Sequence, residues 1–62
     1  MNVNSNLRSF IVFRTLDGSC EWDSCDFGTE LTCVKSHNGV LVRIEKSKEK
    51  AEREVRILNG WI

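Results

Sequence analysis

Proline and tyrosine are absent from this 62-residue chain, which has a single histidine and only four glycines. Without proline, the chain depends on glycine for its sharp turns, because glycine adopts positive φ angles without steric cost. No apolar run approaches the roughly 20 residues that a transmembrane helix needs. The formal net charge is zero, which excludes a global electrostatic attraction to nucleic acid or to an anionic membrane.

The cysteine content and the start of the chain indicate a reducing location. Three cysteines are an odd number, so they cannot all form disulfides within the chain. Residues 1–7 are largely polar and lack the basic and apolar regions of a secretory signal. We therefore expect residues 1–7 to form a flexible arm before one small domain at residues 8–62. The expected location is the cytoplasm, with reduced thiols.

The glycines divide the chain into short segments. Asp17-Gly18 and Asn38-Gly39 are typical of two-residue hairpin turns. The segments around these turns are rich in residues that favour strands, and the predicted strands cover residues 8–16, 19–24, 29–37 and 40–45.

The last segment, residues 47–59, is rich in Glu, Lys, Arg and Ala and predicts a helix. Ser47 is suited to cap its start, and Gly60 to follow its last turn. The sequence thus predicts an α+β fold, in which a four-stranded antiparallel meander precedes one C-terminal helix. A variant in which the same strands curl into a small barrel stays open.

The predicted turns also imply a strand register. A two-residue turn at 17–18 places Phe13 opposite Trp22, and a loop at 25–28 places Cys20 opposite Cys33. Most large apolar side chains then share the face that the helix covers. The other face keeps several apolar side chains that one helix cannot cover, unless the sheet curls and buries them itself.

An uncovered apolar face of this kind is typical of a binding surface. We predict that the partner-binding residues are Phe10, Val12, Arg14, Val34, Leu41 and Arg43. The chain is therefore interpreted as a small non-catalytic protein that binds another protein, with a homodimer as the simplest arrangement. Under this hypothesis Val12→Asp abolishes association and leaves the monomer folded. By analogy of size and composition, the chain is similar to phage-encoded or mobile-element modulators of host proteins.

Metal binding and catalysis find little support in the residue spacing. The series Cys20, Cys25, Cys33 and His37 has the residue types that zinc prefers. On a strand at 29–37, however, Cys33 and His37 lie about 13 Å apart, at about 3.3 Å per residue. The predicted register also orients no base toward a cysteine nucleophile. We therefore expect no metal, no cofactor and no enzyme activity.

Nucleic-acid binding is the alternative function. The expected helix has a basic start, formed by Lys46, Lys48, Lys50 and Arg53, although glutamates are interleaved with these residues. In addition, the segment VKSHNGVLVRI at 34–44 resembles the strand–turn–strand of the carbon storage regulator family. Members of that family are small RNA-binding dimers with short strands and a C-terminal helix. The resemblance implies a dimeric RNA-binding regulator.

Overall fold

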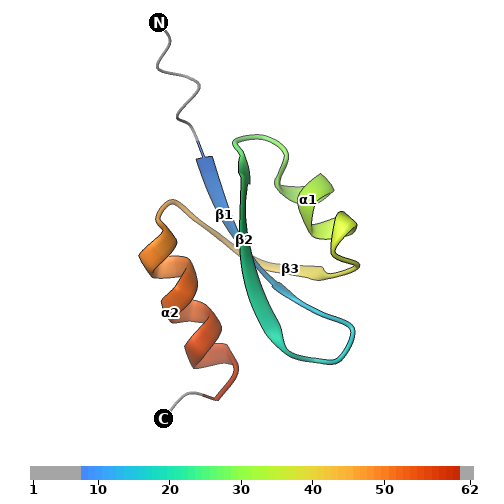
Figure 1. Ribbon diagram of the computed structural model, residues 1–62, viewed down its shortest axis with the longest axis vertical. Helices are drawn as coiled ribbons and strands as arrows, with labels where there is room; N and C mark the ends of the chain where they lie inside the picture. The colour runs from blue at the N-terminus through green and yellow to red at the C-terminus, as the bar shows by residue number, and fades with distance from the viewer. Residues whose placement is uncertain (1–7, 61–62) are drawn as a thin grey trace, which may run out of the picture.

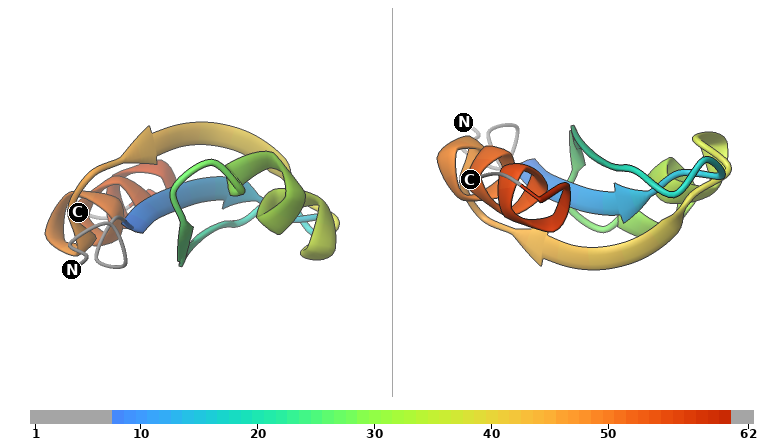
Figure 2. Two further views of the ribbon diagram at one scale, coloured as in Figure 1. Left: turned by 90° about the horizontal axis from the view of Figure 1, so that it is seen from above. Right: turned by 90° about the horizontal axis from the view of Figure 1, so that it is seen from below.

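The computed structural model describes residues 8–60, which form three strands and two helices. In chain order these elements are β1 (Arg8–Arg14), β2 (Cys20–Asp26), α1 (Glu30–Ser36), β3 (Val40–Glu45) and α2 (Lys48–Leu58). The strands form one antiparallel sheet in the order β2-β1-β3. The two helices lie on opposite sides of this sheet (Figure 1), which is twisted and curved (Figure 2). The predicted N-terminal arm lies outside the described residues.

The predicted four-stranded sheet, flat or curled into a barrel, is wrong, because residues 30–36 form α1 and not a strand. The α+β class and the C-terminal helix are confirmed. As predicted, Ser47 caps α2: its hydroxyl oxygen accepts a hydrogen bond of 3.2 Å from the backbone N–H of Lys50. Gly60 follows the helix with a positive φ of 83°.

Asn38-Gly39 ends a helix here and does not form the predicted hairpin turn. Asn38 has a φ of 55°. Its N–H donates to the Lys35 carbonyl at 2.9 Å, and the Gly39 N–H donates to the Val34 carbonyl at 3.1 Å. These two bonds form a Schellman motif, which closes a helix with a left-handed residue. An Asn-Gly pair is compatible with a hairpin turn and with the end of a helix. The packing of α1 on the sheet favours the helix end here.

The turn at Asp17-Gly18 is longer than predicted and changes the register. The Asp17 carboxylate accepts hydrogen bonds from the Thr15 hydroxyl and from the Ser19 N–H and hydroxyl, and these bonds lower the pKa of Asp17 to about 2. The resulting loop places Val12, and not Phe13, opposite Trp22. A slip of one residue moves every side chain of a strand to the other face. The predicted faces of β2 are therefore exchanged relative to β1.

The helices cover two separate apolar clusters. On the α1 side, Ile11 and Phe13 of β1 pack with Cys25 and Val34, and all four are buried. On the other side, Val12 and Ala51 have no exposed surface, and Cys20 is 2% exposed. The Asn59 amide fixes the end of α2 to β2, because it accepts from the Cys20 N–H at 2.8 Å and donates to the Cys20 carbonyl at 2.9 Å.

Gly39 allows the start of β3 to approach β1 closely. A Cβ atom at this position would lie 2.8 Å from Cδ2 of Phe13 and 3.1 Å from the carbonyl oxygen of Arg14. Because neither the buried ring nor the strand backbone has room to move, we expect Gly39→Ala to lower the free energy of unfolding by about 1–3 kcal/mol. Urea denaturation measures this change. Thr32→Ala, an exposed substitution on α1, is the control and should stay within about 0.5 kcal/mol. A wild-type unfolding curve for Gly39→Ala would contradict the close approach.

Candidate metal centre

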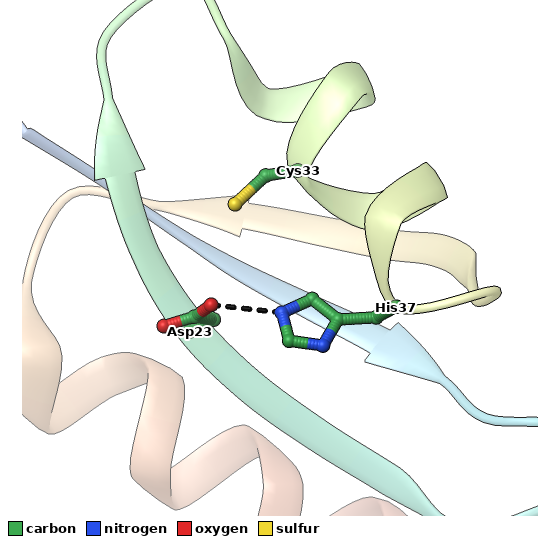
Figure 3. Close-up of side chains that lie close together, drawn as sticks. All are labelled: Asp23, Cys33 and His37. Atoms are coloured by element: carbon green, nitrogen blue, oxygen red, sulfur yellow. Dashed lines mark hydrogen bonds and ion pairs between the residues drawn. The ribbon is translucent and has the colours of Figure 1, made fainter.

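Strand β2 and helix α1 bring together Asp23, Cys33 and His37 (Figure 3). These residues offer a carboxylate oxygen, a thiol sulfur and an imidazole nitrogen, all within 4.8 Å of one another. Asp23 of β2 lies directly opposite Ile11 of β1, so its side chain is on the sheet face that α1 covers. Cys33 projects from α1, and His37, the C-cap residue directly after that helix, projects toward the same face. The three side chains therefore converge on one point from two elements.

The helix explains why the sequence spacing was misleading. On a strand, Cys33 and His37 would lie far apart, whereas residues four apart on a helix have Cβ atoms only about 5–6 Å from each other. The prediction of no metal site thus depended on a strand that the structure replaces with α1. Cys20, another member of the predicted series, lies on the opposite face of the sheet, beside α2. Cys25 is buried on the same face as Asp23, but outside the group of three.

His37 is held in place by two contacts. Its ring stacks on the buried Phe13 ring, with a centroid separation of 4.6 Å and an angle of 18° between the planes. Its Nε2 atom lies 2.8 Å from Oδ2 of Asp23. This hydrogen bond lowers the pKa of Asp23. A metal ion would replace the bond, because an Nε2 atom that donates to a carboxylate must lose its proton before it can bind a metal. Both side chains remain about two-fifths exposed, at 38% for His37 and 43% for Asp23, so an ion can reach them from solvent.

The start of α1 is anchored beside this cluster. The hydroxyl of Ser9, a buried residue of β1, donates a hydrogen bond to the Glu30 carboxylate. The same carboxylate accepts from the Gly28 N–H at 3.0 Å. These bonds lower the pKa of Glu30, with the Ser9 bond contributing most. They connect β1, the loop before the helix and the first turn of α1, and so fix where Cys33 meets β2.

The arrangement suits metal binding better than nucleophilic catalysis. Burial raises the pKa of the Cys33 thiol, and the neighbouring Cys25 and Asp23 raise it further, whereas a catalytic cysteine needs a lowered pKa. In a catalytic triad the imidazole also stands between nucleophile and acid, using one nitrogen for each. Figure 3 shows the Cys33 thiol and the Asp23 carboxylate on the same side of the His37 ring. Three ligands around one point are the geometry of a metal site.

The residues predicted to bind a partner do not share one surface. Val12 and Val34 are buried on opposite faces of the sheet. Phe10 is half-buried on the α2 side, beside Trp22, and Leu41 is half-buried on the α1 side. The two arginines of that set are exposed, and Arg43 pairs with Glu54 of α2 at 3.4 Å.

The basic residues of the alternative function, Lys46, Lys48, Lys50 and Arg53, are all exposed. Two of them line an open hollow of about 420 Å³ beside α2, together with Glu49, Glu52 and Arg56. Because acidic and basic groups mix there, nucleic-acid binding stays a prediction. The segment at 34–44 that resembles the carbon storage regulator family contains the end of α1 and then β3, and not a strand–turn–strand.

Comparison of the chain with known protein families, curated proteins and solved structures finds no match. Across residues 8–60, neither helix has the length and apolar character needed to cross a membrane.

Proposed function

We propose that this chain is a small non-catalytic module that binds one Zn²⁺ ion through Asp23, Cys33 and His37. The observation that carries the proposal is the convergence of the three ligand atoms within 4.8 Å. Zinc bonds of 2.0–2.3 Å in a tetrahedron put the ligand atoms about 3.5 Å apart, so side-chain shifts of about 1 Å close the site. A water molecule from the exposed side supplies the fourth ligand. The thiol and imidazole favour zinc over calcium or magnesium, which prefer oxygen alone.

The bound ion would connect the sheet to α1. Such a crosslink matters in a chain of 62 residues, because a domain this small buries only about 60% of its unfolded surface and has marginal stability. A bound zinc ion supplies folding free energy directly, since the unfolded chain has no preformed site. Binding requires Cys33 as a thiolate, and a reducing compartment such as the cytoplasm preserves that thiol.

Zinc titration of metal-free protein, followed by calorimetry and elemental analysis, tests this function. We expect one Zn²⁺ per chain, and an affinity at least about 100-fold lower in Cys33→Ser and in Asp23→Asn. Acidification should weaken binding, because protons compete with zinc for the thiolate and the imidazole. Cys20→Ala, on the other face of the sheet, is the control and should bind as the wild type does. A metal content near zero at saturating zinc would refute the site.

A second function, protein association, is favoured by the exposed edge of the sheet. Strand β3 is at the edge in the order β2-β1-β3, and no strand among residues 8–60 pairs with its outer side. Its side chains Val40, Val42 and Ile44 are 70%, 39% and 47% exposed. Exposed apolar edge strands are templates for pairing with another strand. We propose that the partner is a second copy of this chain, because antiparallel pairing centred on Ile44 sets each Arg43 opposite Glu45 of the other copy.

Ile44→Asp tests this association. Ile44 is 47% exposed and lies at the centre of the proposed pair, where the variant sets two like charges opposite each other, so we expect it to shift a monomer–dimer equilibrium toward the monomer by at least about tenfold and to leave the fold intact. Sedimentation equilibrium measures the shift. Leu16→Asp is the control, because Leu16 is 87% exposed in a loop away from β3. A wild-type protein that stays monomeric at millimolar concentration would contradict the dimer.

A further inference from the structure

We propose that Cys25 and Cys33 form an oxidation-sensitive pair that controls the metal site, and this inference rests on the proposed zinc-binding function. When a peroxide joins the two sulfurs in a disulfide, Cys33 leaves the ligand set and the metal is released. A thiol reductant restores the thiol and with it the site. The pair is thus both a modification site and a regulator of metal occupancy.

The two cysteines belong to the same apolar cluster. Cys25 is 6% exposed and belongs to the buried group on the α1 side of the sheet, and the half-buried Cys33 packs against that group. Cys25 lies two residues after Asp23 on β2, so strand alternation points both side chains toward α1. The Cys25 thiol also contributes to the raised pKa of the Cys33 thiol, as expected for neighbouring sulfur atoms.

The third cysteine is kept out of this pair by the sheet. Cys20 lies five residues before Cys25 on the same strand, so its side chain points to the opposite face, where it is buried beside α2. The hydrogen bonds between Asn59 and the Cys20 backbone hold the strand against that helix. The three cysteines therefore comprise one pair on the α1 side of the sheet and one separate thiol on the α2 side.

The chemistry assigns different roles to the two sulfurs. Hydrogen peroxide transfers an oxygen atom to the more exposed Cys33, which becomes a sulfenic acid, and the peroxide is reduced to one water. The Cys25 sulfur then attacks the sulfenic sulfur, forming the S–S bond and releasing a second water that takes up the Cys25 proton. The two electrons lost by the thiols thus reduce one peroxide.

The test treats zinc-loaded and metal-free protein with hydrogen peroxide. Released zinc is followed with a chromogenic chelator, and the crosslink is located by peptide mass mapping without reduction. We expect a Cys25–Cys33 disulfide, one remaining free thiol and loss of the metal. After reduction, rebinding of zinc should be nearly complete. In Cys25→Ser, oxidised Cys33 has no resolving thiol and proceeds to the sulfinic acid, so we expect recovery below about a tenth. Cys20→Ala should form the crosslink as the wild type does.

The outcomes separate this inference from the proposed function. Stoichiometric zinc binding with no Cys25–Cys33 crosslink, or with a crosslink to Cys20, overturns the redox pair and leaves the metal site standing. Equal recovery in Cys25→Ser and wild type also overturns it. A crosslink in protein that never binds zinc overturns the proposed function and its control by oxidation, while the crosslink itself confirms that the sulfurs meet.

Discussion

Val12→Asp is expected to unfold the protein. Val12 lies in the central strand of the sheet, opposite Trp22 on one side and Arg43 on the other, and has no exposed surface. An aspartate here either buries a charge or takes up a proton, and both cost several kcal/mol in free energy. A domain of this length has a total stability of roughly 3–9 kcal/mol, at about 0.05–0.15 kcal/mol per residue. Most of the folded population should therefore be lost, as measured by circular dichroism and urea denaturation.

The chain offers a matched control for this prediction. Val40→Asp makes the same substitution at another strand valine, one that is 70% exposed. At protein concentrations where the wild type is monomeric, we expect its free energy of unfolding to change by less than about 0.5 kcal/mol. If Val12→Asp remains folded with wild-type stability, Val12 is not part of the core. Such a result would support the role that the sequence predicts for Val12 as a partner-binding residue, in which case Val12→Asp affects association alone.

The sequence misplaces Val12 because it predicts one helix on the sheet, whereas α1 and α2 cover both faces and Val12 lies on the face that α2 covers. One residue of loop length causes a second error, in the faces of β2. The sequence correctly indicates strands at residues 8–14 and 20–24, since Phe, Ile and Val are dense in the first and turn residues separate them. It cannot distinguish a two-residue turn from the longer loop that the Asp17 carboxylate stabilises through Thr15 and Ser19. Because strand side chains alternate, this small difference decides which face of β2 meets α1.

Helix α1 is the element that sequence reasoning could not find. Its residues ELTCVKS include Thr, Cys and Val, whose intrinsic preferences favour a strand, and its seven residues are too few to be stable alone. The helix depends on tertiary contacts, chiefly Val34 against Ile11 and Phe13. The C-terminal helix was predictable because propensity, capping and apolar spacing agree there. The candidate metal centre was missed together with α1, since a helix is what brings Cys33 and His37 together. A spacing of four residues between Cys and His was the available signal.

Zinc is expected to raise the stability of the folded protein by about 4 kcal/mol when its free concentration is about 1,000 times the dissociation constant. For a domain of this size, that increase corresponds to a rise in Tm of about 15–30 °C, at about 4–8 °C per kcal/mol. The reason is that a bound ion would join β2, through Asp23, to α1 and its C-cap, through Cys33 and His37, whereas the unfolded chain does not hold these groups together. Differential scanning calorimetry with and without zinc measures the effect.

The Tm of each variant is measured with and without metal, and the difference between the two is compared with that of the wild type. Any effect of the substitution on the stability of the metal-free protein then cancels. This matters most for His37→Gln, which also loses the ring stacked on Phe13. We expect the zinc-dependent rise in Tm to disappear in His37→Gln, Cys33→Ser and Asp23→Asn. Asp26→Asn removes a carboxylate that is 76% exposed on the same strand and should keep the full rise. Equal stabilisation of wild type and Asp23→Asn would mean that zinc binds elsewhere, because a carboxylate that supplies one of three protein ligands cannot be replaced by an amide without loss of affinity.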